Sequence, residues 1–186
     1  KLATKLDYPV ALFEQPDEEI PLPLTFHRKH AKLTKTAQNR IHAEMNFAVM
    51  HMRRLLRSAD VDCDLTIPSI CPEEHGTPTT VARALRDHWQ VPRGPIEDLV
   101  ALLERAGVLI VSQDIGTNDL QGFSVWPSGM PPLMLVNAKM PADRQRHTLA
   151  HELGHLVMHH AFIAADATDV ERQADEFASE FLMPAA

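Results

Sequence analysis

Residues 133–160 read LMLVNAKMPADRQRHTLAHELGHLVMHH, and a change of periodicity inside this stretch decides the fold class. The first four residues are apolar and are typical of a short strand, which Asn137 ends. Within 143–160 the apolar residues recur at three- and four-residue steps, as one face of a helix requires. A second helix with its own apolar stripe is predicted over 169–183. The sequence therefore predicts a strand followed by a pair of helices.

Upstream of this stretch, the spacing of apolar residues predicts helices first and strands afterwards. Three short strands separated by turn signals favour a small, largely antiparallel sheet packed against helices. The order of helices, sheet and helices is that of an α+β fold. The upstream helices are predicted over 36–58, 78–89 and 95–106, and the upstream strands over 108–111 and 122–126.

The composition divides the chain into three parts. Residues 1–35 are rich in proline and are predicted to be a linker or arm, and residues 36–94 a helical extension. Residues 95–186 hold the predicted strands and the last two helices, and they form the predicted core.

Bulk properties exclude several classes of protein. The formal net charge of -7 is the wrong sign for a protein whose whole surface binds nucleic acid, and a short basic stretch at 27–35 is interpreted as solvated. No apolar run approaches the ~18 residues that span a bilayer, and no signal peptide opens the chain. Cys63 and Cys71 are too few to hold a secreted fold together, so free thiols in a cytoplasmic protein are expected.

The helix over 143–160 contains the pentapeptide His151-Glu152-Leu153-Gly154-His155, an H-E-x-x-H pattern. Two histidines four residues apart lie on one helix face, so both imidazoles can bind one metal ion. Glu152 lies about 100° round the helix, where it can accept a proton from a water at that metal. The competing interpretation is a core helix whose histidines only form hydrogen bonds.

A catalytic zinc site takes three protein ligands, so a third is needed. Met158 and Ala161 exclude the metzincin pattern. The next helix offers Glu171 as the ligand, with Asp175 on the same face to accept the free ring N–H of a ligating histidine. The alternative is that Glu171 forms a capping box with Thr168.

Other polar residues near the motif are candidates for subsidiary roles. His159 and His160 are reserve ligands. His147, Arg172 and His159 are candidates to stabilise the transition state. Either cysteine could fill the fourth metal position, although their spacing carries no metal signature.

Residues 133–184, and above all the segments RHTLAHELGH and ERQADEFASEFLMP, resemble the ImmA/IrrE family of metallopeptidases. Two positions depart from the usual family pattern: His147 stands where an aromatic residue is common, and Phe181 where leucine is usual. The resemblance covers about half of the chain, extending more weakly back to Pro95.

The resemblance implies a compact zinc-dependent endopeptidase core of the gluzincin type over 95–186. It implies that His151, His155 and Glu171 bind Zn²⁺ and that Glu152 is the general base. Family members cut helix-turn-helix repressor proteins and so release silenced genes. Residues 2–13 look like the tail of a phage-repressor-like helix-turn-helix domain, so DNA contact is expected only through a missing upstream domain.

Two expectations concern how such a protein acts. The substrate is predicted to lie as an added strand along Leu133, Leu135 and Asn137, because this strand precedes the site helix and is expected at the sheet edge. The alternative function is a DNA-binding regulator whose zinc domain senses a ligand or partner without cleavage. The intact Glu152 argues against that alternative, since a purely structural site needs no base.

Overall fold

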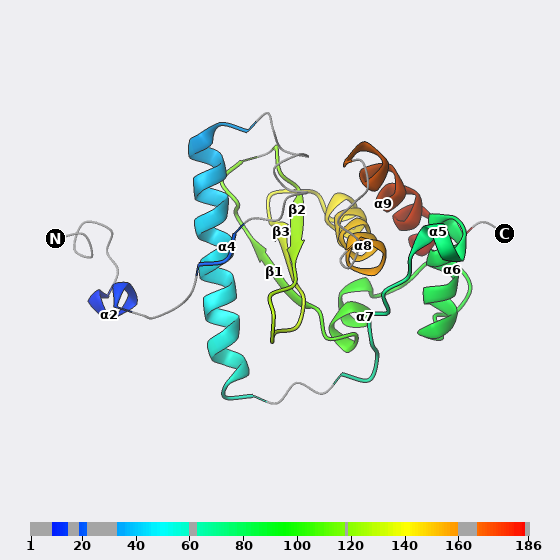
Figure 1. Ribbon diagram of the computed structural model, residues 1–186, viewed down its shortest axis with the longest axis horizontal. Coiled ribbons are helices and arrows are strands. Elements are labelled where there is room, and N and C mark those ends of the chain that lie inside the picture. The colour runs from blue at the N-terminus through cyan, green and yellow to red at the C-terminus, as the bar shows by residue number, and fades with distance from the viewer. Residues whose placement is uncertain are drawn as a thin grey trace.

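Figure 1 shows the computed structural model, which describes residues 9–14, 19–21, 33–59, 63–117, 119–159 and 167–184. A small sheet lies in the middle, with α4 on one side and α8 on the other, and α9 packs beyond α8 (Figure 1). Helices, strands and helices follow one another along the chain, so the predicted α+β order is confirmed. The described elements are α2 (Val10–Phe13), α4 (Lys35–Leu56), α5 (Pro72–His75), α6 (Pro78–His88), α7 (Leu99–Arg105), β1 (Leu109–Gln113), β2 (Gly122–Val125), β3 (Leu133–Asn137), α8 (Ala142–Met158) and α9 (Ala167–Leu182).

Two helices differ from their predicted positions. The helix predicted from Pro95 begins at Leu99, because the Asp98 side chain caps it by accepting a hydrogen bond from the backbone of Ala101 at 2.9 Å. The short helix α5 lies between the helices predicted over 36–58 and 78–89, where no helix was predicted. Most of the predicted arm, including residues 27–32 of the basic stretch, lies outside the described residues, and Lys35 begins α4.

The sheet is mixed, so the prediction of a largely antiparallel sheet is wrong for one of its two pairings. The strand order is β1-β3-β2, in which β2 pairs antiparallel with β3 and β1 pairs parallel with β3. The connection from β1 to β2 reverses the chain, and the connection from β2 to β3 reverses it again. The first and third strands therefore run in the same direction, and β3 enters between the other two.

Side chains of β3 alternate between two hydrophobic clusters. Leu133 and Leu135 belong to the cluster that α4 completes with Ile41 and Met45. Met134 belongs to the other cluster, which contains apolar residues of α6, α7, α8 and α9. These five side chains have no exposed surface. Helix α4 thus shares a core with the strands, while the division of the chain into extension and core stays a prediction.

A buried arginine fixes the far end of α9. Arg86 of α6 is 4% exposed and donates hydrogen bonds to the carbonyl oxygens of Phe181 at 2.5 Å and Gly94 at 2.7 Å, and to that of Pro92. Burial lowers the pKa of the Arg86 guanidinium, and the nearby Glu180 carboxylate opposes this shift. The bond to Phe181 holds the C-terminal turn of α9 against α6, and the other two hold the segment that follows α6.

Among the described helices, none has an apolar stretch long enough to cross a membrane.

Candidate metal centre

Helix α8 places two histidines on one face, one turn apart. The Nε2 atoms of His151 and His155 are 3.0 Å apart, and the ring centroids are 4.7 Å apart. His151 is 6% exposed, so its ring is nearly enclosed by protein. Two ring nitrogens this close can share a hydrogen bond, or both can offer their lone pairs to one metal ion.

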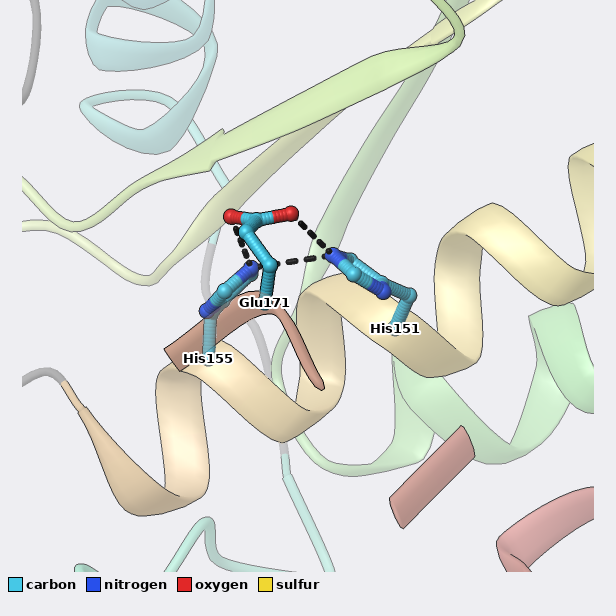
Figure 2. A group of neighbouring side chains, drawn as sticks. All are labelled: His151, His155 and Glu171. Carbon is cyan, nitrogen blue, oxygen red and sulfur yellow. Dashed lines mark hydrogen bonds and ion pairs between the residues drawn. The ribbon is translucent and has the colours of Figure 1, made fainter. Parts of the chain in front are cut away.

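Glu171 of α9 offers a third candidate ligand atom. Its Oε2 lies 3.3 Å from Nε2 of His151, and its Oε1 lies 3.3 Å from Nε2 of His155. Figure 2 shows the carboxylate spanning the two rings. Ligand atoms bound at 2.0–2.1 Å in a tetrahedron lie about 3.3 Å from one another. The three side chains therefore fit the coordination shell of one metal ion, and together they are the group that could hold a metal among the described residues; we call it the metal-binding group.

The capping-box interpretation of Glu171 does not match the helix start. Helix α9 begins at Ala167, so Thr168 lies inside the helix and not at its N-cap. Glu171 is consequently beyond the first turn, and its carboxylate points at the two histidines (Figure 2).

Asp175, one turn further along α9, contacts the outer nitrogen of His151. Its Oδ1 lies 2.7 Å from Nδ1 of that ring. A carboxylate can only accept here, so Nδ1 carries the proton and Nε2 keeps the lone pair that a metal requires. Asp175 thereby fixes the tautomer and the orientation of His151.

Glu152 is buried, and a residue from the sheet holds it. Its side chain is 5% exposed, and the hydroxyl of Ser124 in β2 donates to its Oε2 at 2.7 Å. Sequence reasoning missed Ser124, which is 28 residues from Glu152 in the chain. Its one signal was a polar residue between Phe123 and Val125 in an alternating strand, which predicts a polar group on one sheet face but not its partner.

Comparison with known families bears directly on this site. Residues 103–186 match the family model described as the IrrE N-terminal-like domain, Peptidase_M78. This segment is an ImmA/IrrE-family peptidase domain. The match covers a little under half of the chain and includes the three candidate ligands and Glu152. The family is one of metallopeptidases, so the match supports a peptidase-like function for this segment. No curated protein matches the chain.

The peptidase domain has a cleft of about 470 Å³ at the metal-binding group. His151, Glu152 and Glu171 line this cleft. The rest of the lining comes from the loop before β2, from β2 itself, from the first turns of α8 and from α9. The other lining residues are Asp119, Gln121, Gly122, Arg144, His147, Thr148 and Asp175.

Of the candidate transition-state residues, the peptidase domain brings His147 to the cleft. Arg172 instead pairs with Glu176 at 2.5 Å and Asp169 at 3.3 Å on the exposed face of α9. The hydrogen bond to Glu176 raises the pKa of the Arg172 guanidinium, which stays charged. His159 contacts the outer nitrogen of His155, behind the metal-binding face.

Two further predictions concern additional metal ligands. The reserve ligand His160 lies outside the described residues. Neither Cys63 nor Cys71 belongs to the metal-binding group of the described chain.

The prediction of an added substrate strand along β3 is wrong. β3 is the central strand, and both of its edges are already paired, to β1 and to β2. All five of its residues are buried. Asn137 has a structural role, because its side chain donates to the carbonyl oxygens of Thr117 at 2.7 Å and Leu120 at 3.0 Å. Leu133 and Leu135 are core residues.

Proposed function

We propose that this chain is a zinc-dependent endopeptidase of the gluzincin type. The observation that carries the proposal is the spacing of the three ligand atoms, 3.0, 3.3 and 3.3 Å, which suits a tetrahedral ion. Two imidazoles and one carboxylate form a ligand set typical of catalytic zinc, which leaves the fourth position open. The buried general-base candidate beside this group distinguishes it from a structural metal site.

The residues of the chain then perform the proton transfers of peptide hydrolysis. Zinc bound by His151, His155 and Glu171 would supply a Lewis acid that lowers the pKa of a bound water to about 7. Glu152 accepts a proton from the attacking water as its oxygen bonds to the peptide carbon. Glu152 then gives this proton to the leaving nitrogen as the C–N bond breaks. Ser124, which holds Oε2, keeps the carboxylate aimed at the cleft.

We propose that the substrate binds as an extended segment along β2. This strand is at the edge of the sheet, and Gly122 within it lines the cleft. An extended peptide can hydrogen-bond to an exposed strand edge, which brings its backbone past the metal-binding group. A Cβ at position 122 would lie 2.7 Å from the carbonyl oxygen of Leu135, so only glycine fits there without displacement.

The proposed substrate class is a transcriptional repressor of the helix-turn-helix type, whose cleavage would regulate gene expression. The family assignment of residues 103–186 is what supports this class. The competing function is a regulator whose metal domain senses a partner and cuts nothing.

The test combines metal analysis with a cleavage assay on Glu152→Gln and Glu171→Ala. We expect about one zinc per chain in the wild type and in Glu152→Gln, and a sharp loss of zinc in Glu171→Ala. We expect the wild type alone to cut members of a library of unstructured peptides and purified helix-turn-helix repressors, followed by mass spectrometry.

Each contrary result has a defined meaning. Full cleavage by zinc-loaded Glu152→Gln would remove Glu152 as the base. Equal zinc in wild type and Glu171→Ala would remove Glu171 from the site. Zinc binding by a wild type that cuts nothing would favour the sensing regulator.

A further inference from the structure

The two histidine ligands of the proposed metal site are held from behind by different groups. His151 is held by the carboxylate of Asp175. His155 is held by another histidine, because its Nδ1 lies 3.1 Å from Nδ1 of His159. The outer nitrogen of His159, Nε2, lies 2.9 Å from Oε1 of Gln173 in α9. A line of contacts therefore runs from His155 through His159 to Gln173.

Only one arrangement of protons satisfies this line of contacts once Nε2 of His155 offers its lone pair to a metal. Nδ1 of His155 must then carry the proton and donate it. Nδ1 of His159 must accept, so it is the bare nitrogen of a neutral ring. The proton of His159 is consequently on Nε2, where it donates to the amide oxygen of Gln173. Each group has one role, and the direction of donation runs away from the metal site.

We propose, on the basis of the metal site described above, that His159 and Gln173 are positioning residues for the ligand His155. Gln173 holds His159 in the tautomer that can accept, and His159 in turn holds His155 with Nε2 bare and facing the other two ligands.

The local backbone supports this role for His159. The residue is the C-cap of α8, and its backbone N–H donates to the carbonyl oxygen of His155 at 2.9 Å. Backbone and side chain of His159 thus both contact residue 155. Gln173 lies between Glu171 and Asp175 in sequence, so three side chains of α9 act on the two histidines. Glu171 and Asp175 contact His151 directly, and Gln173 acts on His155 through His159.

The decisive measurement is the zinc affinity of the full chain, determined by chelator competition. His159→Phe keeps a ring but removes the acceptor, and we expect it to bind zinc about tenfold more weakly, in line with other groups behind metal ligands. His159→Asn places an amide oxygen near the position of Nδ1, so it should recover most of this loss. Gln173→Leu removes only the outer bond and should weaken zinc binding about fivefold.

A spectroscopic measurement separates positioning from packing. In the zinc-loaded protein labelled with ¹⁵N-histidine, the Nδ1 proton of His155 should give a downfield hydrogen-bonded signal in wild type and His159→Asn. This signal should move upfield or broaden in His159→Phe. His51→Phe, at an exposed position on α4, is the matched control and should change neither zinc affinity nor this signal.

The results distinguish this inference from the function on which it rests. A wild type that binds no zinc would overturn both. Zinc binding by His159→Phe equal to that of the wild type would overturn the positioning role alone. If His159→Asn bound zinc as weakly as His159→Phe, the hydrogen bond would not be the cause. Should His159→Phe fail to fold by circular dichroism, unchanged affinity in Gln173→Leu would overturn the proposal.

Discussion

The two faces of the small sheet are built by the same strands and yet carry different chemistry. On the α4 face the strands present apolar side chains such as Phe123 and Leu135, which form a closed cluster with α4. On the α8 face they present Met134 and, beside it in β2, the hydroxyl of Ser124. That hydroxyl contacts the buried carboxylate of Glu152.

The difference shows how a very small domain can bury a polar site. The α4 face is closed mainly by apolar packing, with the pair Gln113–Glu44 at its margin, so it adds rigidity to the sheet. The other face can then hold buried polar groups, provided that each has a partner. Among the described residues, no fully buried side-chain nitrogen or oxygen lacks a hydrogen-bond partner. We therefore expect mutations on the α4 face to change stability alone, and mutations on the α8 face to change stability and metal binding together.

The largest expected effect comes from a matched pair of leucine truncations. Leu135 and Leu153 are both fully buried, the first on the α4 face and the second on α8 between the two histidines. Leu135→Ala and Leu153→Ala should each lower the free energy of unfolding by about 3 kcal/mol. Only Leu153→Ala should also weaken zinc binding, because its cavity lies under the ligand helix. Denaturant unfolding and chelator competition measure the two quantities, and equal zinc affinities in the pair would break the comparison.

A smaller effect is expected from the serine that joins the sheet to the site. Ser124→Ala removes a hydrogen bond to a charged group and should lower kcat about tenfold with little change in KM. Ser112 is an exposed serine of β1 that is paired with Val136 and so lies on the same face, which makes Ser112→Ala the control. The measurement is steady-state cleavage of whichever peptide the wild type cuts. A kcat for Ser124→Ala equal to the wild-type value would show that Glu152 needs no support from β2.

The sequence predicted most of the elements because their signals are local. Helical spacing placed His151 and His155 on one face of α8, and the structure brings them together with Glu171. The start of α7 was misplaced because Pro95 is a common first-turn residue, whereas the cap is made by Asp98 three residues later. A local sequence signal predicts whether an element is a helix or a strand more accurately than it predicts the residue at which the element begins.

The position of β3 in the sheet could not be predicted from periodicity alone. Strand pairing joins residues that are far apart in sequence, such as Leu109 and Leu133, and no local preference records that choice. One signal was present, however. Four consecutive apolar residues at 133–136 are typical of a strand covered on both faces, whereas the alternation at 122–126 is typical of an edge. Ser124 could not be paired with Glu152 before this order was known.

The smallest expected effect concerns the close approach of α8 and α9, on which the α8 face depends. A Cβ at Gly154 would lie 3.0 Å from Cδ1 of Phe177 and 3.4 Å from Cα of Ala174. Alanine there gains about 1 kcal/mol in helix propensity, while overpacking costs about 1–3 kcal/mol, so Gly154→Ala should destabilise the protein by about 1 kcal/mol.

The same substitution should weaken zinc binding several-fold, because pushing α9 away moves Glu171 from the histidines. Gly129→Ala is the control, since no atom lies within 4 Å of its Cβ and its φ of +71° alone should cost about 1 kcal/mol. Two variants of equal stability would then differ only in zinc affinity, measured by chelator competition. If Gly154→Ala were more stable than the wild type and bound zinc equally well, Phe177 would have moved aside, and the spacing of the two helices would not set the geometry of the ligands.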